Sequence, residues 1–149
     1  MRAPRVIPVP SAALIPVRHP VLRPGLPVST ASFEGDDHPE AIHLAVEVEG
    51  ALVGVASLIP AQWEGAPALQ LRGMAVLEAH QRRGLGTLLV REALDAARQA
   101  AARVVWCNAR VRAVPLYLRA GFEEIGAPFE IPGVGPHLRL WIRLTPSSG

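Results

Sequence analysis

Apolar and polar residues alternate along the stretch that begins near residue 42, and this period of two predicts β-structure. Ile42–Val48 alternates, and Glu49-Gly50 predicts a tight turn into a second strand at Ala51–Ile59. The proline-bounded stretch Pro60–Pro67 is expected to be a loop, and Leu69–Val76 a third strand. These segments predict an antiparallel hairpin followed by another strand.

After Gly84 the hydrophobic period changes to that of a helix. Charged residues occupy one side, and apolar residues form a single stripe on the other, at Leu85, Leu88, Leu89, Ala93, Ala96, Ala97 and Ala100. Because alanine has a small side chain, this helix is expected to lie close to a sheet.

The remaining segments predict short elements. Prolines interrupt the first 40 residues, so only a strand near Arg5–Pro8 and a broken helix over Ala12–Leu22 are expected before a polar loop at Phe33–Pro39. Further on, we expect an apolar strand at Val104–Cys107 and a helix at Ala113–Ala120. Two final strands are expected at Phe122–Ile125 and Leu138–Leu144, with a loop at Pro128–Pro136 between them. This succession predicts one α/β domain over residues 1–149, irregular in 1–40 and with its core at 41–144.

Composition narrows the possible functions. The formal net charge of the 149 residues is only +2, so no nucleic-acid partner is expected. All fifteen basic residues are arginines, which excludes a Schiff-base lysine and the phosphate-binding lysine of a P-loop. No apolar run reaches the roughly 18 residues of a membrane span, so no membrane association is expected. Cys107 is the only cysteine, and a reducing, cytoplasmic location follows as the expectation.

One segment carries a signal for anion binding. A strand ends near Val76, and a turn with Gly84 and Gly86 then opens the amphipathic helix. The first N–H groups of a helix have no partner within it, and the helix dipole adds partial positive charge there. Glycines let a phosphate approach the backbone. A diphosphate therefore fits this turn without a lysine, with Arg82 and Arg83 at its rim.

The turn matches neither a Walker loop nor a dinucleotide-binding fingerprint, because it lacks Gly-Lys-Ser/Thr and G-x-G-x-x-G. Instead Gln81, Gly84 and Gly86 form Q-x-x-G-x-G, which resembles the acetyl-CoA signature of the GNAT superfamily of N-acetyltransferases. Tyr117, Gly121 and Phe122 resemble a later motif of that family. The resemblance covers about residues 41–144. The runs Trp106–Arg110 and Phe129–His137 are similar to a subgroup of small uncharacterised bacterial members.

The resemblance implies the GNAT fold, an α/β (α+β) arrangement with a mixed central sheet of about six to seven strands and helices on both faces. It implies acetyl-CoA as co-substrate and no metal, with the cofactor lying between the strands at Leu71–Val76 and Val104–Cys107. The family often has Asn where this chain has Arg110, so Asn108 is the candidate for that contact. The residues implied to bind the cofactor are Met74, Ala75, Val76, Gln81, Arg82, Arg83, Gly84, Leu85, Gly86, Thr87 and Asn108.

The resemblance also implies direct attack of an amine on the thioester, with Tyr117 as the general acid for the leaving thiolate. A general base must neutralise the amine, whose pKa of about 10.4 makes the neutral form cost about 4.6 kcal/mol at pH 7. Glu130 and His137 are the main candidates for this base, and His43, Glu34 and Glu78 are further ones. Cys107 lies in an apolar strand and is expected to be inert.

The expected partner is an amine acceptor, either a small molecule or a peptide. Trp63, Phe33 and Phe129 are candidates to line its site, and Arg72 and Arg110 to attract an acidic acceptor. The apolar C-terminal strand with Trp141 is a candidate homodimer interface, and burial within the monomer explains it equally. Two other interpretations remain: a non-catalytic acyl-CoA sensor of the same fold, and a nucleic-acid-binding domain that uses Arg82, Arg83, Arg91 and Arg98, which a solvated helix face explains more simply.

Overall fold

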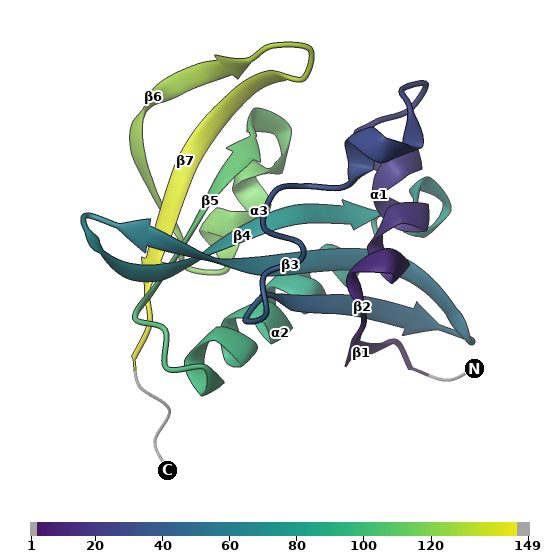
Figure 1. Cartoon of the computed structure of the whole chain (residues 1–149), viewed down its shortest axis with the longest axis horizontal. Helices are drawn as coiled ribbons and strands as arrows, with labels where there is room; N and C mark the ends of the chain where they lie inside the picture. The colour runs from purple at the N-terminus through teal and green to yellow at the C-terminus, as the bar shows by residue number, and fades with distance from the viewer. Residues whose placement is uncertain (1–2, 146–149) are drawn as a thin grey trace.

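Seven strands form one mixed sheet in the computed structural model, which describes residues 3–145 (Figure 1). The spatial order is β1-β2-β3-β4-β5-β7-β6, with every neighbouring pair antiparallel except β4 and β5. The mixed sheet expected from the sequence is confirmed. The strands are β1 (Arg5–Pro8), β2 (Ile42–Val48), β3 (Ala51–Trp63), β4 (Ala66–Val76), β5 (Val104–Arg110), β6 (Glu123–Ile131) and β7 (Gly135–Arg143).

Helices cover both faces of the sheet, as predicted (Figure 1). On one face α1 (Ile15–Leu22) packs against β3 and β4, whereas α2 (Leu85–Gln99) and α3 (Val114–Arg119) cover the other face. Four short 3-10 helices join these elements, at Ser11–Leu14, Val28–Ala31, Glu78–His80 and Val111–Ala113. Within the described residues, no helix is both long and apolar enough to cross a membrane.

The apolar stripe of α2 forms the centre of the larger core. Its buried residues face β2 to β5 and α3, and fully burying one Leu or Val contributes about 1.5–3 kcal/mol. Several such contacts hold the helix, and its first turn with it, in a defined position on the sheet. The buried residues of α2 are Leu85, Leu89, Val90, Ala93, Leu94 and Ala97. The predicted stripe missed Val90 and Leu94, and Ala100, which it included, is exposed at the C-cap.

The loop predicted at Pro60–Pro67 is wrong, because β3 and β4 continue through it as a long hairpin. Glu64 and Gly65 close the hairpin with φ angles of 51° and 81°, the left-handed pair of a two-residue type I′ turn. Pro60 is tolerated in β3 because pairing with β2 ends at Leu58, so one edge of β3 is open there and no N–H is required.

The loop predicted at Pro128–Pro136 is wrong for a similar reason. Strands β6 and β7 form a second hairpin with only residues 132–134 between them. Pro128 lies in β6 where the register shifts between Ile125 and Phe129. Pro136 precedes His137, the residue at which the pairing of β7 with β5 begins, so Pro136 has no partner on that side. Prolines in a sheet are accepted at such irregular and edge positions.

Candidate active site

The centre of the sheet opens where the two parallel strands diverge. β4 and β5 pair only at Leu69 with Val105 and at Gln70 with Trp106, although β4 continues to Val76 and β5 to Arg110. Beyond that point the facing edges of the two strands have no strand partner (Figure 1). The two strands between which the resemblance places the cofactor thus separate after Gln70 and Trp106.

A β-bulge in β4 changes the direction of the strand along this gap. Ser57 pairs with Arg72 and Val55 with Ala75, so two residues of β4 face the single Ala56 of β3. Gly73, in the bulge, has a φ of +64°, and a Cβ atom there would lie 2.7 Å from Nε of Arg18. Both the backbone conformation and the lack of space require glycine.

The gap leads to the exposed start of α2. The side chain of Gln81 donates a hydrogen bond from Nε2 to the carbonyl oxygen of Val76 at 2.9 Å, which ties the turn to the end of β4. Gly84 is the N-cap residue, with a φ of +78° and no capping side chain. The first N–H groups of α2 therefore point into an exposed turn that also contains Arg82, Arg83 and Thr87.

Gly86 has a packing role that the sequence interpretation missed. A Cβ atom at this position would meet Cδ2 of Leu116 at 3.4 Å, so the glycine allows α2 and α3 to lie close together. Within the motif, Gly84 thus leaves the start of α2 accessible, and Gly86 lets α3, the helix that carries Tyr117, pack against α2.

Tyr117 lies in the core on the α3 side of the sheet. Its ring meets Phe122 edge-to-face at a centroid distance of 5.4 Å, and only 5% of the residue is exposed. Burial raises the pKa of Tyr117 above its ordinary value, and neighbouring Cys107 adds to the increase. Burial also raises the pKa of the Cys107 thiol to about 12, so at neutral pH this cysteine is protonated and a poor nucleophile, as expected.

The base candidates are placed differently from one another. His137 is buried, and its Nδ1–H donates to the carbonyl oxygen of Gly135 at 2.9 Å, which leaves Nε2 as the acceptor of the neutral ring. Its ring lies 6.0 Å from that of Phe129, with which it pairs across β6 and β7. Glu130 is exposed and follows Phe129 in β6, so its side chain points to the opposite face. The structure does not bring Glu130 and His137 together.

The base candidate His43 and the cofactor-contact candidate Asn108 each form hydrogen bonds within the protein. His43 is buried, with Nε2 bonded to the carbonyl oxygen of Asp36 at 2.9 Å and Nδ1 to the Ser57 hydroxyl at 2.7 Å. Its ring nitrogens are thus both occupied. Asn108 accepts a hydrogen bond from Nε of Arg139 at 2.9 Å on the α1 face of β5, whereas α3 and Tyr117 lie on the other face.

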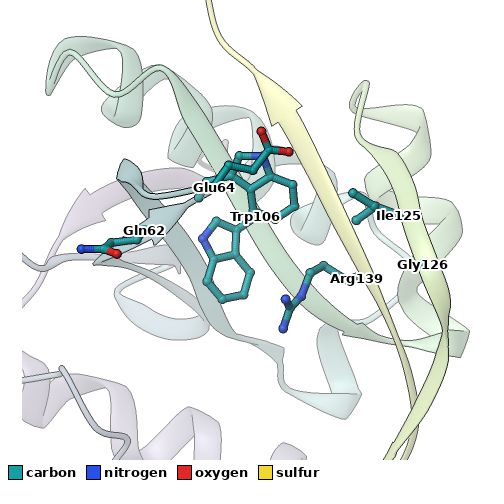
Figure 2. Close-up of a pocket in the computed structure, with 7 residues that line it drawn as sticks. Gln62, Glu64, Trp106, Ile125, Gly126 and Arg139 are labelled. Atoms are coloured by element: carbon teal, nitrogen blue, oxygen red, sulfur yellow. The ribbon is translucent and has the colours of Figure 1, made fainter.

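All three tryptophans gather on the α1 face near the point where β4 and β5 separate. Trp63 stacks on Trp141 at a centroid distance of 5.7 Å and lies 6.0 Å from Trp106. Figure 2 shows Arg139 beside Trp106, its guanidinium 4.8 Å from the ring centroid, in a hollow of about 370 Å³. Sequence reasoning proposed only Trp63 for this surface, because the pairing of Trp106 with Trp141 depends on the β5–β7 register.

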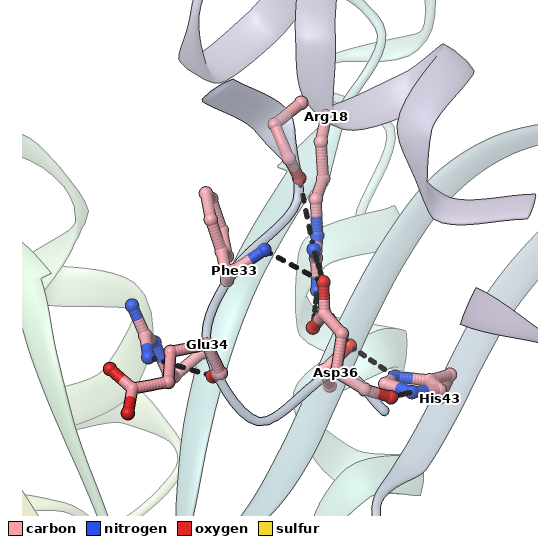
Figure 3. Close-up of polar contacts among 8 residues, drawn as sticks. Arg18, Phe33, Glu34, Asp36 and His43 are labelled. Carbon is pink, nitrogen blue, oxygen red and sulfur yellow. Dashed lines mark hydrogen bonds and ion pairs between the residues drawn. The ribbon is translucent and has the colours of Figure 1, made fainter. Parts of the chain in front are cut away.

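A buried ion pair fixes the loop that follows α1 (Figure 3). Arg18 is fully buried and donates to both carboxylate oxygens of Asp36, at 2.6 and 3.0 Å, and to the Ser57 hydroxyl at 3.0 Å. The backbone N–H of Phe33 also donates to Asp36, at 2.8 Å. Together with His43 these contacts hold the loop over the β4 bulge. Nothing in the sequence pattern indicated this network.

Acid should weaken the fold through Asp36. Burial alone would raise the pKa of this carboxyl, but hydrogen bonds from Arg18 and Phe33, with the charges of Arg18 and His43, hold it below its usual value. The unfolded chain, with a pKa near 3.9, then takes up this proton first. Stability from this group is complete above about pH 5 and falls as the pH drops through the lowered pKa. Urea unfolding at pH 7, 4 and 3 should show a shallower acid loss for Asp36→Asn than for the wild type; equal slopes would contradict this assignment.

The chain is similar to known acetyltransferases. The model of the family described as "Acetyltransferase (GNAT) family" matches residues 16–122. The uncharacterized N-acetyltransferase YitI of Bacillus subtilis (strain 168) is 34% identical over 134 residues, which cover 88% of this chain and 90% of YitI. The streptothricin acetyltransferase of Streptomyces lavendulae is 31% identical over 96 residues, 62% of this chain and 50% of that protein.

Solved structures share the fold. Escherichia coli ElaA superposes with a TM-score of 0.78 at 17% identity, covering 93% of this chain and 99% of ElaA. The yncA protein of Salmonella typhimurium, solved with its cofactor acetyl-CoA, gives a TM-score of 0.73 at 18% identity, covering 99% of this chain and 98% of that protein. The chain belongs to the GNAT acetyltransferase family.

Proposed function

We propose that this protein transfers the acetyl group of acetyl-CoA directly to a primary amine of a small molecule or a peptide. The observation that carries this proposal is the continuous path from the unpaired edge of β4 to the uncapped start of α2. Backbone N–H groups at a helix start bind a diphosphate well, and the unpaired edge of a strand can hydrogen-bond an extended amide chain such as pantetheine. The acetyl-CoA bound to the neighbouring yncA fold supports the same use.

The cofactor contacts divide into two groups. The β4 backbone after the bulge, Met74 to Val76, would bind the pantetheine arm, and one N–H there would stabilise the oxyanion that forms on the thioester carbonyl. The diphosphate would lie against residues 81–87, with Arg82 and Arg83 as mobile counter-charges. Gln81 contributes by ordering the turn through its bond to Val76.

Tyr117 would donate the proton to the departing thiolate. The raised pKa of its buried phenol keeps it protonated at neutral pH, which is the state an acid requires. His137 is the better placed of the two main base candidates, because its Nδ1 is already used by Gly135 and Nε2 can accept a proton directly or through a water. Glu130, which is exposed on the other face, could act only from a different direction. Holding amine and thioester together would supply a further part of the rate, up to roughly 7–11 kcal/mol.

A thiol-release assay with acetyl-CoA and a panel of primary amines tests this function. We expect release that depends on both protein and amine, with the acetylated amine identified by mass spectrometry. Binding of acetyl-CoA without release for any amine would instead support the sensor interpretation. Absence of acetyl-CoA binding at millimolar concentration would overturn the proposal.

Thr87→Glu should separate cofactor binding from folding. Thr87 is exposed in the first turn of α2, where a carboxylate interacts favourably with the helix dipole. The same charge would repel a diphosphate, so the Kd for acetyl-CoA should rise at least about tenfold, equivalent to about 1.4 kcal/mol, while the unfolding midpoint stays equal or increases. Calorimetry and thermal unfolding measure the two effects. The neutral Thr87→Gln is the matched control, and equal affinity for the two variants would argue against a diphosphate at this turn.

A further inference from the structure

Three guanidinium groups surround one aromatic ring on the α1 face of the gap. The Cζ atoms of Arg18, Arg23 and Arg72 lie 4.3, 5.1 and 5.2 Å from the ring centroid of Phe33. Arg110 approaches from the other side of the gap, where it donates to the carbonyl oxygen of Leu22 at 3.2 Å. We call these four arginines the guanidinium cluster; Figure 3 shows Arg18 between Phe33 and Asp36.

The cluster holds more positive charge than the protein neutralises. Asp36 pairs with Arg18. Within residues 3–145, no carboxylate lies within ion-pair distance of Arg23, Arg72 or Arg110. Arg23 and Arg110 both donate to the carbonyl of Leu22, and Arg72 makes one long bond of 3.4 Å to the carbonyl of Glu34. A guanidinium has five N–H donors, so most donors of these three side chains are available to a ligand.

Bringing several like charges together in a partly buried site is electrostatically unfavourable. Burial lowers the pKa of Arg72 and Arg110, and the charges of neighbouring arginines lower both further, while Asp36 and Glu34 act in the opposite direction on Arg72. Glu34 is exposed at the edge of the cluster. An anionic ligand would relieve this repulsion, and arginine forks match the two oxygens of a carboxylate.

Two members of the cluster, Arg72 and Arg110, also lie on the two sides of the gap between β4 and β5. Arg72 directly precedes the β4 bulge at Gly73, and Arg110 ends the part of β5 that has separated from β4. Alternation along each strand points Arg72 and Arg110 to the α1 face, on the two sides of the gap. The fully buried Nε of Arg18 has no partner among residues 3–145 and lies against the bulge.

We infer that the acceptor is a small amine with an anionic oxygen group, foremost a carboxylate, which Arg72 and Arg110 hold while the amine faces the thioester. This inference rests on the proposed acetyl transfer and specifies its substrate class. No covalent step is added: the amine nitrogen forms the amide bond, the thioester C–S bond breaks, and the carboxylate stays unchanged.

Matched acceptors test the inference. Glycine and β-alanine are compared with their amides, and 2-aminoethyl phosphate with ethanolamine, by thiol release at saturating acetyl-CoA. We expect kcat/KM to be at least about tenfold higher for the anionic member of a pair, mainly through a lower KM. A preference confined to the phosphate would make the ligand a phosphorylated amine and overturn the carboxylate assignment. Equal turnover of both members, or preference for the neutral one, would overturn the inference while leaving acetyl transfer intact.

Arg72→Gln and Arg110→Gln should reduce that preference to a few-fold or less. Arg72→Lys keeps the charge but loses the fork, so it should restore part of the preference. Arg91→Gln on the exposed face of α2 is the matched control and should leave the preference unchanged. Thermal unfolding of each variant checks that the fold persists, and an unchanged preference in folded Arg72→Gln and Arg110→Gln would overturn the assignment of these residues.

A binding measurement tests the same inference without turnover. Saturation-transfer NMR with the protein loaded with coenzyme A should detect glycine or β-alanine but not the corresponding amide, and Arg72→Gln should remove the signal. If coenzyme A binds and neither member of a pair gives a selective signal, the inference fails. If acetyl-CoA itself does not bind, the proposed function fails first.

Discussion

Tyr117→Phe is expected to lower kcat about 100-fold or more while the affinity for acetyl-CoA changes little. The variant removes only the phenol oxygen, and positioned proton donors contribute about 10²–10⁴-fold to such reactions. Because the ring itself packs against Phe122, phenylalanine keeps the edge-to-face contact and the volume of the core. Steady-state thiol release measures kcat, and calorimetry measures the Kd for acetyl-CoA.

The stability of the same variant provides its control. Thermal unfolding of Tyr117→Phe should resemble the wild type, whereas Tyr117→Ala should lose about 3–5 kcal/mol because it empties a buried site. Loss of activity together with loss of stability would indicate a packing role only. Full activity of Tyr117→Phe would remove Tyr117 from the mechanism; the chain contains no second tyrosine to replace it.

Asp36→Ala should destabilise the protein by about 3–5 kcal/mol, because it leaves the fully buried guanidinium of Arg18 without its carboxylate partner. The loop over the β4 bulge would lose its anchor at the same time. Urea unfolding at pH 7 measures the loss. The double variant Arg18→Met with Asp36→Ala removes both charges, so it should be less destabilised than Asp36→Ala alone.

An exposed pair of the same type is the matched control. Asp95 accepts a bond from Arg98 at 3.0 Å on the surface of α2, and 52% of the Asp95 side chain is exposed. Asp95→Ala should therefore cost at most about 0.5 kcal/mol. If Asp36→Ala cost as little as Asp95→Ala, the buried network would not be what holds the loop after α1.

The predicted elements were correct where one local rule applied. The stripe on α2 and the Glu49-Gly50 turn both follow from short-range patterns, and the structure confirms them. Glu64-Gly65 makes the same kind of turn but was not recognised, because Pro60 and Pro67 next to it indicated a loop. Whether a proline breaks a strand depends on which neighbour pairs at that position, and this is a property of the sheet.

Proximity within the site was less predictable from the sequence. Gly84 and Gly86 were found by their spacing, but the contact of Gly86 with Leu116 depends on how α2 meets α3. His137 and Glu130 are close in the chain, yet strand alternation places them on opposite faces. The guanidinium cluster unites residues 18, 23, 72 and 110, which no short window of sequence contains.

The sequence by itself determined the family-specific turn, the order of helices and strands and the absence of any lysine chemistry, because these depend on residue identity and on local periodicity. The tertiary structure alone decided where β4 and β5 separate, and that Arg18 leaves no room for a side chain at Gly73. It also decided which arginines meet on the α1 face of the gap. Those features come from strand register and from packing between residues distant in the chain, and neither is encoded in any single stretch of it.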